Sequence, residues 1–193
     1  MTKERQIIFS DPMVRALLDG IKTQTRRLVN PQPVGFSGRW AWETNKWFSD
    51  RRQPNGDDDG SPTPCPYGRP GDRLWVREAW SRESWPSGVT TEYRASWGKA
   101  GDRLKWKPAI HMPREYSRIR LEITDVRVER LHEISEADAL VEGMASMMRG
   151  CTRSADEARG WFQYLWNTLH PGIGSWQDNP WVWVISLRRI ESS

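Results

Sequence analysis

The stretch Gly20-Ile21-Lys22-Thr23-Gln24-Thr25-Arg26-Arg27 decides how the first part of the chain folds. It places one amine, two hydroxyl groups and two guanidinium groups directly after a glycine. Gly20 suits the left-handed backbone conformation that ends many helices, because glycine has no Cβ to clash there. We therefore expect a helix to end here, with Lys22 and Thr25 on the connection to a strand, where functional side chains are often displayed.

The segment before this stretch has the pattern of an amphipathic helix. Val14, Leu17 and Leu18 recur at helical spacing. Pro12 suits a first helical turn, since the N–H that proline lacks would have no partner there. The pattern predicts a helix over 12–19, with a short strand before it at 7–9 and an extended segment after it at 25–29.

Segment 118–130 has the clearest strand pattern in the chain. Ile119, Leu121 and Ile123 alternate with charged residues, but Val126 and Val128 continue the apolar series out of phase. This change of phase predicts a β-bulge near Thr124-Asp125. Other strands are predicted at 73–80, 91–95 and 181–190.

Two further helices are predicted in the second half of the chain. Ser135 and Asp138 have the spacing of a capping box, with Asp in the place of the usual Glu, and Gly143 is suited to stop the helix after Val141. Segment 154–169 is apolar on one face and predicts an amphipathic helix. Strands with three helices inserted between them predict an α+β fold, a small mixed β-barrel.

The chain is expected to form a single domain over 1–193, since no repeat or second domain is visible. An irregular insert at 31–70, rich in Pro, Gly, Asp and Trp, interrupts it. Trp40, Trp42 and Trp47 suggest a local hairpin at its start. A loop of this length is unusual in a compact domain, so it is either functional or mobile. Its tryptophans could supply a surface for a protein partner.

Composition narrows the classes of partner. The net charge is +4, and Arg exceeds Lys by 23 to 6, with 13 Trp in the chain. Arginine binds phosphate and stacks on bases, and tryptophan stacks on bases, so the two together suit single-stranded nucleic acid or a nucleobase. Most of the tryptophans alternate with apolar residues in strands, however, and we expect only one or two to contact a ligand.

The sequence gives no indication of a membrane span, a signal peptide, a metal or a cofactor. No apolar run is long enough to span a bilayer, and no apolar region follows the N-terminal charges. The two cysteines, Cys65 and Cys151, lie far apart, which favours a reducing, cytoplasmic setting. The histidines are scattered, no Walker A or GxGxxG pattern is present, and the aspartates at 57–59 suit a solvated loop.

Three blocks of the sequence resemble the ASCH domain family, whose fold is related to the PUA RNA-binding barrel. The family pattern of Gly, Lys, Thr and Arg is matched by Gly20, Lys22, Thr25 and Arg27. Block 71–78 is similar to the family's turn and strand, and block 131–144 to its short acidic helix followed by Glu-Gly. The sequence and order of the three blocks are most similar to those of phage or prophage ASCH proteins. This resemblance implies that the protein acts in the cytoplasm of a bacterial cell or of a phage-infected host.

The resemblance also implies a catalytic set. In a small ASCH amidohydrolase acting on N4-acetylcytidine, a lysine, a threonine and a glutamate occupy the places of Lys22, Thr25 and Glu142. These residues would be the base, the nucleophile on an acyl carbon, and the group that orients or protonates. From spacing alone, Lys22 is better explained as a solvated lysine at a helix end, and only the resemblance favours a catalytic role. Thr25 is also consistent with a strand residue or a backbone cap.

Other residues are weaker candidates for substrate binding. Arg27 could bind a phosphate or hold the pocket, and Arg26 stands beside it. Tyr67, Trp75 and His111 could line a base pocket, although each residue type is more often structural.

Three functions therefore stay open. The first is a hydrolase that removes an acyl group from N4-acylated cytidine or a related modified base. The second is a ribonuclease of the ASCH type. The third is a module of phage origin without chemistry, which would bind RNA through Arg–phosphate contacts and a stacked base, or a protein through the insert at 31–70.

Overall fold

The computed structural model of the chain describes residues 2–30, 32, 39–41, 46–48, 62–97, 103–147 and 157–190. Within these ranges the fold is a mixed α+β arrangement on one five-stranded sheet, with the order β1-β6-β9-β10-β2. Its strands are β1 (Glu4–Ile8), β2 (Gln24–Leu28), β6 (Arg73–Arg77), β9 (Arg120–Arg130) and β10 (Trp181–Ile190). β1 runs parallel to β6, and all other neighbours are antiparallel. The expected α+β class is therefore observed.

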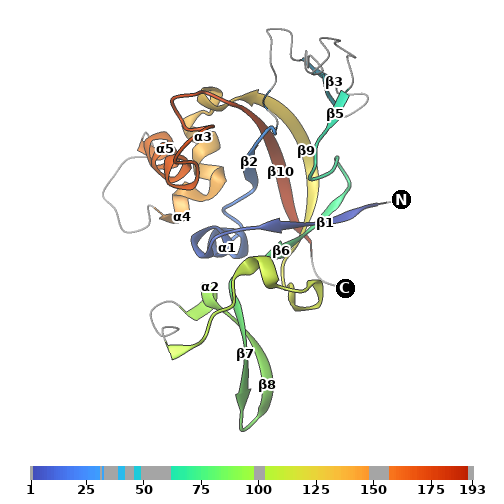
Figure 1. The fold of residues 1–193 in the computed structure, drawn as a ribbon, viewed down its shortest axis with the longest axis vertical. Coiled ribbons are helices and arrows are strands. Elements are labelled where there is room, and N and C mark those ends of the chain that lie inside the picture. The colour runs from blue at the N-terminus through green and yellow to red at the C-terminus, as the bar shows by residue number, and fades with distance from the viewer. Residues whose placement is uncertain are drawn as a thin grey trace.

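The described strands form an open sheet rather than the small closed barrel expected from the sequence. A barrel needs backbone pairing all the way round, whereas β1 and β2 are the two unpaired edges of this sheet. The chain passes between these edges through α1 (Asp11–Leu18) (Figure 1). One side chain spans the gap, because Arg27 Nη2 on β2 donates a hydrogen bond of 2.8 Å to the Ile8 carbonyl oxygen on β1.

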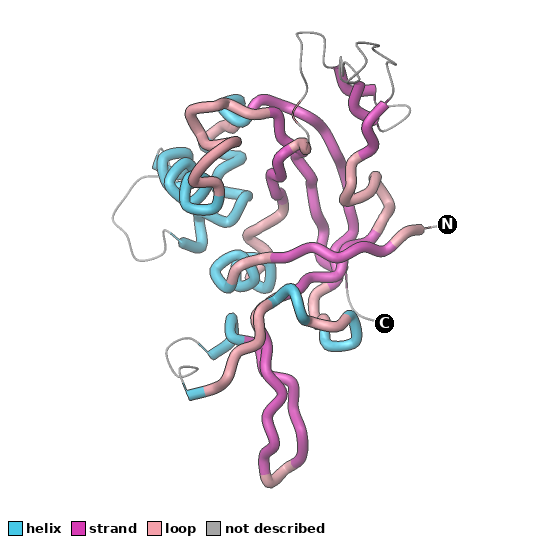
Figure 2. Tube along the Cα trace, viewed as in Figure 1, coloured by secondary structure: helices cyan, strands magenta, loops and turns pink. Residues whose placement is uncertain are grey.

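Helices pack beside the sheet at the three places predicted from the sequence (Figure 2). They comprise α1, then α3 (Glu136–Ala139) with α4 (Ala145–Met147), and finally α5 (Ala158–Leu169), while a further short helix, α2 (Arg94–Trp97), follows β8. Short 3-10 turns are η2 (Ala109–His111), η3 (Arg114–Tyr116) and η4 (Leu131–Glu133). A π-helical turn, η5 (Leu140–Met144), joins α3 to α4. Within the described ranges, every helix is too short or too polar to cross a bilayer.

A long hairpin extends away from the body of the molecule (Figure 1). It is formed by β7 (Trp80–Trp85) and β8 (Gly88–Tyr93), which pair antiparallel. The single strand predicted over 73–80 is therefore two strands, and the break falls at Glu78 and Ala79. The Glu78 side chain is buried and binds Arg118, so this position serves a polar contact instead of continuing the apolar alternation.

The β-bulge predicted in the longest strand is confirmed. Ser186 of β10 pairs with Asp125, but the next residue, Leu187, pairs with Ile123, which leaves Thr124 without a partner in the ladder. Ile123 and Val126 can therefore both point into the core, where each has a relative exposure of 0%. The bulge keeps both halves of β9 buried on the same face.

The described part of the insert at 31–70 forms a small separate sheet. β3 (Arg39–Ala41) pairs with β4 (Lys46–Phe48), which pairs with β5 (Pro62–Pro64). Trp40 lies opposite Trp47, so the predicted hairpin is confirmed. Trp42, the aspartates at 57–59 and Cys151 lie outside the described residues.

Candidate functional site

A cavity of about 550 Å³ lies where the end of β1, α1, β2, η5 and α5 meet the segment before η2. Its floor contains buried side chains, including Lys22, Thr25 and Glu142, the three residues predicted as a catalytic set. The volume falls within the range of small-molecule sites, which is roughly 300–1,000 Å³. The fold thus brings together residues that are up to 120 positions apart in the sequence.

The Lys22 backbone is held by the end of α1. Gly20 has a φ of +72°, the left-handed conformation predicted for it. The chain then turns back so that the N–H groups of Ile21 and Lys22 both donate to the Ala16 carbonyl oxygen, at 2.9 and 3.0 Å. This double hydrogen bond fixes the direction in which Lys22 leaves the helix.

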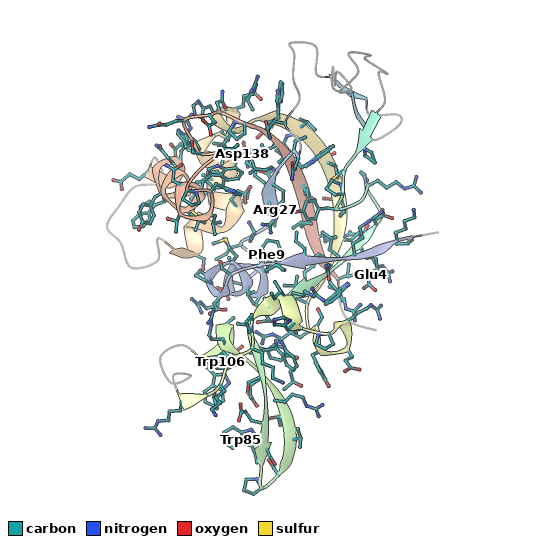
Figure 3. The ribbon with its side chains drawn as sticks, viewed as in Figure 1. Glu4, Phe9, Arg27, Trp85, Trp106 and Asp138 are labelled. Atoms are coloured by element: carbon teal, nitrogen blue, oxygen red, sulfur yellow. The ribbon has the colours of Figure 1, made fainter. Side chains whose placement is uncertain are left out.

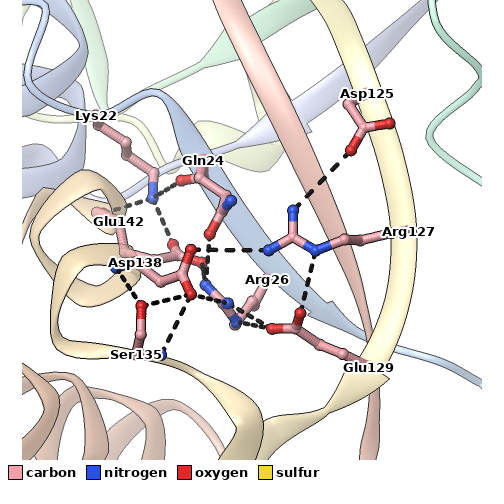
Figure 4. A network of polar contacts seen from close by, with 9 residues as sticks. All are labelled: Lys22, Gln24, Arg26, Asp125, Arg127, Glu129, Ser135, Asp138 and Glu142. Carbon is pink, nitrogen blue, oxygen red and sulfur yellow. Dashed lines mark hydrogen bonds and ion pairs between the residues drawn. The ribbon is translucent and has the colours of Figure 1, made fainter.

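The Lys22 ammonium group donates three hydrogen bonds (Figure 4). Its acceptors are the Gln24 carbonyl oxygen at 2.8 Å, the Glu142 carbonyl oxygen at 2.6 Å and Glu142 Oε2 at 2.8 Å. An ammonium group has three N–H donors, so all of them are satisfied. The side chains of Lys22 and Glu142 are 2% and 4% exposed, which makes this a buried ion pair.

Glu142 reaches Lys22 with two atoms because of the backbone of η5. Gly143 within this π-helical turn has a φ of +109°, which only glycine adopts without strain. A Cβ atom at this position would lie 3.2 Å from the Ala16 Cβ. The glycine therefore lets the turn pack against α1 and aim the Glu142 carbonyl oxygen at Lys22.

The electrostatic surroundings lower the pKa of Lys22. Burial is the largest cause, because it disfavours the charged form, and the guanidinium groups of Arg27 and Arg26 act in the same direction. The Glu142 carboxylate opposes them but does not cancel their effect. A lysine in such a place gives up its proton at a lower pH than a lysine in water, as a general base requires.

The hydroxyl group of Thr25 makes no hydrogen bond to any residue of the described ranges, although the residue is only 3% exposed and lines the cavity. Lys22 does not donate to Thr25, since its acceptors are Gln24 and Glu142. The Thr25 hydroxyl is left with its hydrogen-bonding capacity free toward the cavity.

Arg26 belongs to a buried polar network rather than to an open binding surface. Its side chain has an exposure of 0%. The guanidinium group donates to Glu129 Oε1 at 2.9 Å, to Gln24 Oε1 at 2.7 Å and to Glu142 Oε1 at 3.2 Å. Asp138 stands 3.5 Å away. Burial opposes ionisation of this carboxyl group, but the hydrogen bonds from Ser135 and then the charge of Arg26 outweigh it and lower the pKa of Asp138. Arg26 thus fixes Glu142 from the side opposite Lys22.

Arg27 lies on the same side of β2 as Thr25, because alternate residues of a strand face the same way. Its guanidinium carbon lies 5.1 Å from the ring centroid of Phe9, and Lys22 Nζ lies 5.5 Å from the same centroid. Figure 3 shows Arg27 beside Phe9. The Nε atom of Arg27 is buried and has no hydrogen-bond partner among the described residues.

Several residues of the cavity were not predicted from the sequence. They are Phe9, Trp106, Lys107, Trp166 and His170. The His170 ring centroid lies 4.4 Å from that of Trp166, and burial followed by the charge of Arg27 lowers the pKa of His170. These residues come from three segments that lie far apart in the chain, at 9, 106–107 and 166–170, and no local spacing connects one segment with another.

Three predicted substrate-binding residues do not line the cavity. Trp75 is buried in β6, where the Arg77 guanidinium carbon lies 4.9 Å from its ring centroid. Tyr67 packs against the core, and His111 is exposed at the end of η2. Within the described ranges, no group of three His, Cys, Asp or Glu side chains gathers closely enough to hold a metal ion.

Comparison with known proteins gives little further information. The chain matches no protein family and no curated protein. Among solved structures, it is similar to the crystal structure of protein EF3133 from Enterococcus faecalis V583, family-model DUF984. The TM-score is 0.44 and the identity 10%, over 98% of this chain and 81% of that chain.

Proposed function

We propose that this protein is an RNA- or nucleoside-directed hydrolase of the ASCH type, related to PUA-like proteins, that removes the acyl group from N4-acylated cytidine or a related modified base. One observation carries the proposal. Lys22, Thr25 and Glu142 line one cavity of nucleoside-accommodating size, and the amine and the carboxylate are in contact at 2.8 Å. The sequence resemblance to ASCH proteins supports the same assignment of residues.

In this mechanism the neutral amine of Lys22 takes the proton of the Thr25 hydroxyl group, and the Thr25 oxygen attacks the acyl carbon. The bond between the acyl carbon and N4 then breaks, and N4 receives the proton from Lys22, so that cytidine leaves. A water molecule, deprotonated by Lys22, then attacks the acyl carbon of the Thr25 ester. The acyl group leaves as a carboxylic acid, and the Thr25 oxygen takes the proton back from Lys22, which restores the hydroxyl group. Glu142 orients Lys22 throughout.

The mechanism requires one change from the contacts described above. A neutral amine has two N–H donors and one lone pair, so one of the three acceptors of Lys22 must be released when the proton is lost. The lone pair then becomes free to accept from Thr25. The lowered pKa of Lys22, caused mainly by burial, favours this step.

Turnover of N4-acetylcytidine, followed by chromatography, tests the proposal. Lys22→Met removes the base at similar volume, and we expect turnover to fall by about 10²- to 10⁴-fold. Lys105→Ala changes an exposed lysine that does not line the cavity and should have no effect. A folded Lys22→Met protein with unchanged turnover would contradict the role of Lys22.

The nucleophile is tested by two variants of Thr25. Thr25→Ser keeps a hydroxyl group and should retain turnover, whereas Thr25→Val keeps the shape and should lose it. Equal turnover in the two variants would exclude Thr25 as nucleophile. Because neither variant removes a buried charge, this pair remains informative even if Lys22→Met fails to fold.

A second candidate function is a module that binds a modified nucleoside or RNA without chemistry. The full set of hydrogen bonds on Lys22 favours it, because a satisfied ammonium group is a stable structural element. Binding of N4-acetylcytidine with no release of cytidine, together with steep salt dependence of RNA binding, would support this candidate.

A further inference from the structure

The side chains that line the cavity become more exposed from its floor to its rim. Lys22, Thr25 and Glu142 are at most 4% exposed and form the floor. Arg27, Trp106 and His170 are half-buried and form the wall, and Lys107 is exposed at the rim. A ligand whose reacting end meets Lys22 and Thr25 must therefore leave its other end beside the wall and rim.

The charges of the cavity are not balanced. Glu142 pairs with Lys22 and Arg26, and Asp11 pairs with Arg94. Within the described ranges, Arg27 and Lys107 have no carboxylate partner. Both lie over aromatic rings instead, Arg27 over Phe9 and Lys107 over Trp80, where Nζ is 4.7 Å from the centroid. The excess charge of the wall and rim is positive, which favours an anionic ligand group.

The wall also carries unused hydrogen-bonding capacity. The buried Nε of Arg27 has no acceptor among the described residues, although its Nη2 is bound to the Ile8 carbonyl oxygen. Buried donors without partners are rare in folded proteins, and each calls for an explanation. A ligand oxygen that drew the guanidinium group toward the cavity would supply the missing acceptor.

We propose that Arg27, His170 and Lys107 form a phosphate subsite, so that the preferred ligand is a phosphorylated nucleoside rather than a free one. This inference rests on the proposed function, because that function places the base of the ligand at the floor. Arg27 offers a planar fork of donors and Lys107 a mobile point charge, two complementary ways to bind phosphate. Phe9 and Trp106 supply the apolar and aromatic wall between this subsite and the floor.

Binding measurements test the subsite without requiring turnover. We compare cytidine with cytidine 5′-monophosphate by isothermal titration calorimetry and expect the phosphorylated ligand to bind at least tenfold more tightly. Lys107→Gln should remove most of this preference, because it lowers the affinity for cytidine 5′-monophosphate far more than the affinity for cytidine. Lys105→Gln, an exposed lysine two residues away and outside the cavity, is the matched control and should keep the preference.

Further variants separate the members of the subsite. Arg27→Gln should also abolish the preference, but it loses the hydrogen bond to Ile8, so Lys107→Gln remains the decisive variant. The chain has three histidines, and His170→Gln assigns the His170 resonance. That resonance should shift with cytidine 5′-monophosphate and not with cytidine.

Equal affinities for the two ligands would overturn the phosphate subsite, and so would a preference that survives both Lys107→Gln and Arg27→Gln. A 5′-phosphorylated oligocytidine and its 5′-hydroxyl counterpart distinguish the source of the phosphate. Tighter binding of the phosphorylated strand alone supports a terminal phosphate, and equal tight binding of both supports an internal one. Failure of the proposed hydrolase function would be seen in a different experiment, the turnover assay, as the absence of acyl release from N4-acetylcytidine.

Discussion

Two buried carboxylates of this protein are paired with cations in different ways. Glu78 is 1% exposed and accepts two hydrogen bonds of 2.8 Å from the guanidinium group of Arg118, whose carbon lies 4.1 Å from the Tyr93 ring centroid. Glu142 is 3% exposed but divides its oxygens between Lys22 and Arg26. Only Glu142 lines the cavity.

The comparison teaches that burial of a charge does not by itself mark a functional site. A single arginine satisfies both oxygens of Glu78 with a bidentate fork. Glu142 instead holds an amine that can lose its proton, beside a hydroxyl group and an open volume. The first pair is suited to hold the base of the hairpin, and the second is suited to acid–base chemistry.

The largest expected effect is that of Glu142→Gln on turnover. We expect a loss of about 10²-fold or more, because Lys22 loses the group that orients it. The neutral amine is the active form, so turnover rises with pH through the lowered pKa of Lys22 and levels off before an ordinary lysine would titrate. Since Glu142 favours the protonated amine, Glu142→Gln should move this rise to lower pH. An unchanged pH–rate profile in Glu142→Gln would contradict the claim that Glu142 acts on the pKa of Lys22.

Glu78→Gln should affect stability rather than chemistry. Removing one partner of a buried ion pair costs about 3–5 kcal/mol, and the one-quarter exposure of Arg118 reduces this to roughly 2–3 kcal/mol. Chemical denaturation measures the loss. The value of kcat/KM for the folded variant should equal that of the wild type, and a large fall would show that Glu78 also serves the cavity.

Gly143→Ala tests the backbone that aims Glu142. The φ of +109° and the 3.2 Å approach to the Ala16 Cβ both oppose a side chain, so we expect a loss of about 1–3 kcal/mol in stability. Turnover should also fall, because the Glu142 carbonyl oxygen would shift. Gly160→Ala on α5 is the control, since nothing lies within 4 Å of its added Cβ. That variant should be neutral or slightly stabilising.

The smallest effect on stability is expected when the N-cap of α3, the helix before Glu142, is removed. Asp138 N donates to Ser135 Oγ at 3.0 Å, so Ser135→Ala should cost about 1 kcal/mol. A thermal melt compared with Ser84→Ala, which changes an exposed serine on β7, measures this cost. No change would mean that α3 depends on packing alone.

Local patterns in the sequence predict much of this fold. The left-handed Gly20, the bulge at Thr124 and the cap at Ser135 each follow from a few neighbouring residues, and all three are confirmed. Whether β1 and β2 pair depends on how strongly the whole sheet curves. No local sequence pattern predicts this curvature. The predicted barrel is therefore an open sheet within the described residues.

The candidate site is predictable only in part, because its residues come from distant segments that no local sequence pattern connects. Lys22 and Glu142 lie 120 positions apart in the sequence, and no spacing between residues so distant predicts their contact. His170 and Lys107 reach the cavity from separate segments that no motif connects. Trp75 has a suitable residue type, but strand packing places it in the core.

The hydrogen bond between Arg27 and the Ile8 carbonyl oxygen has a mechanical consequence. Strands joined by a backbone ladder separate only when several bonds break together. Within the described residues, β1 and β2 are instead joined by one side-chain hydrogen bond, with a net worth of about 0.5–1.5 kcal/mol. A change of the Arg27 rotamer would break this bond while the backbone pairing inside the sheet stays intact. Because Arg27 also lines the cavity, the same change would move a side chain of the cavity wall.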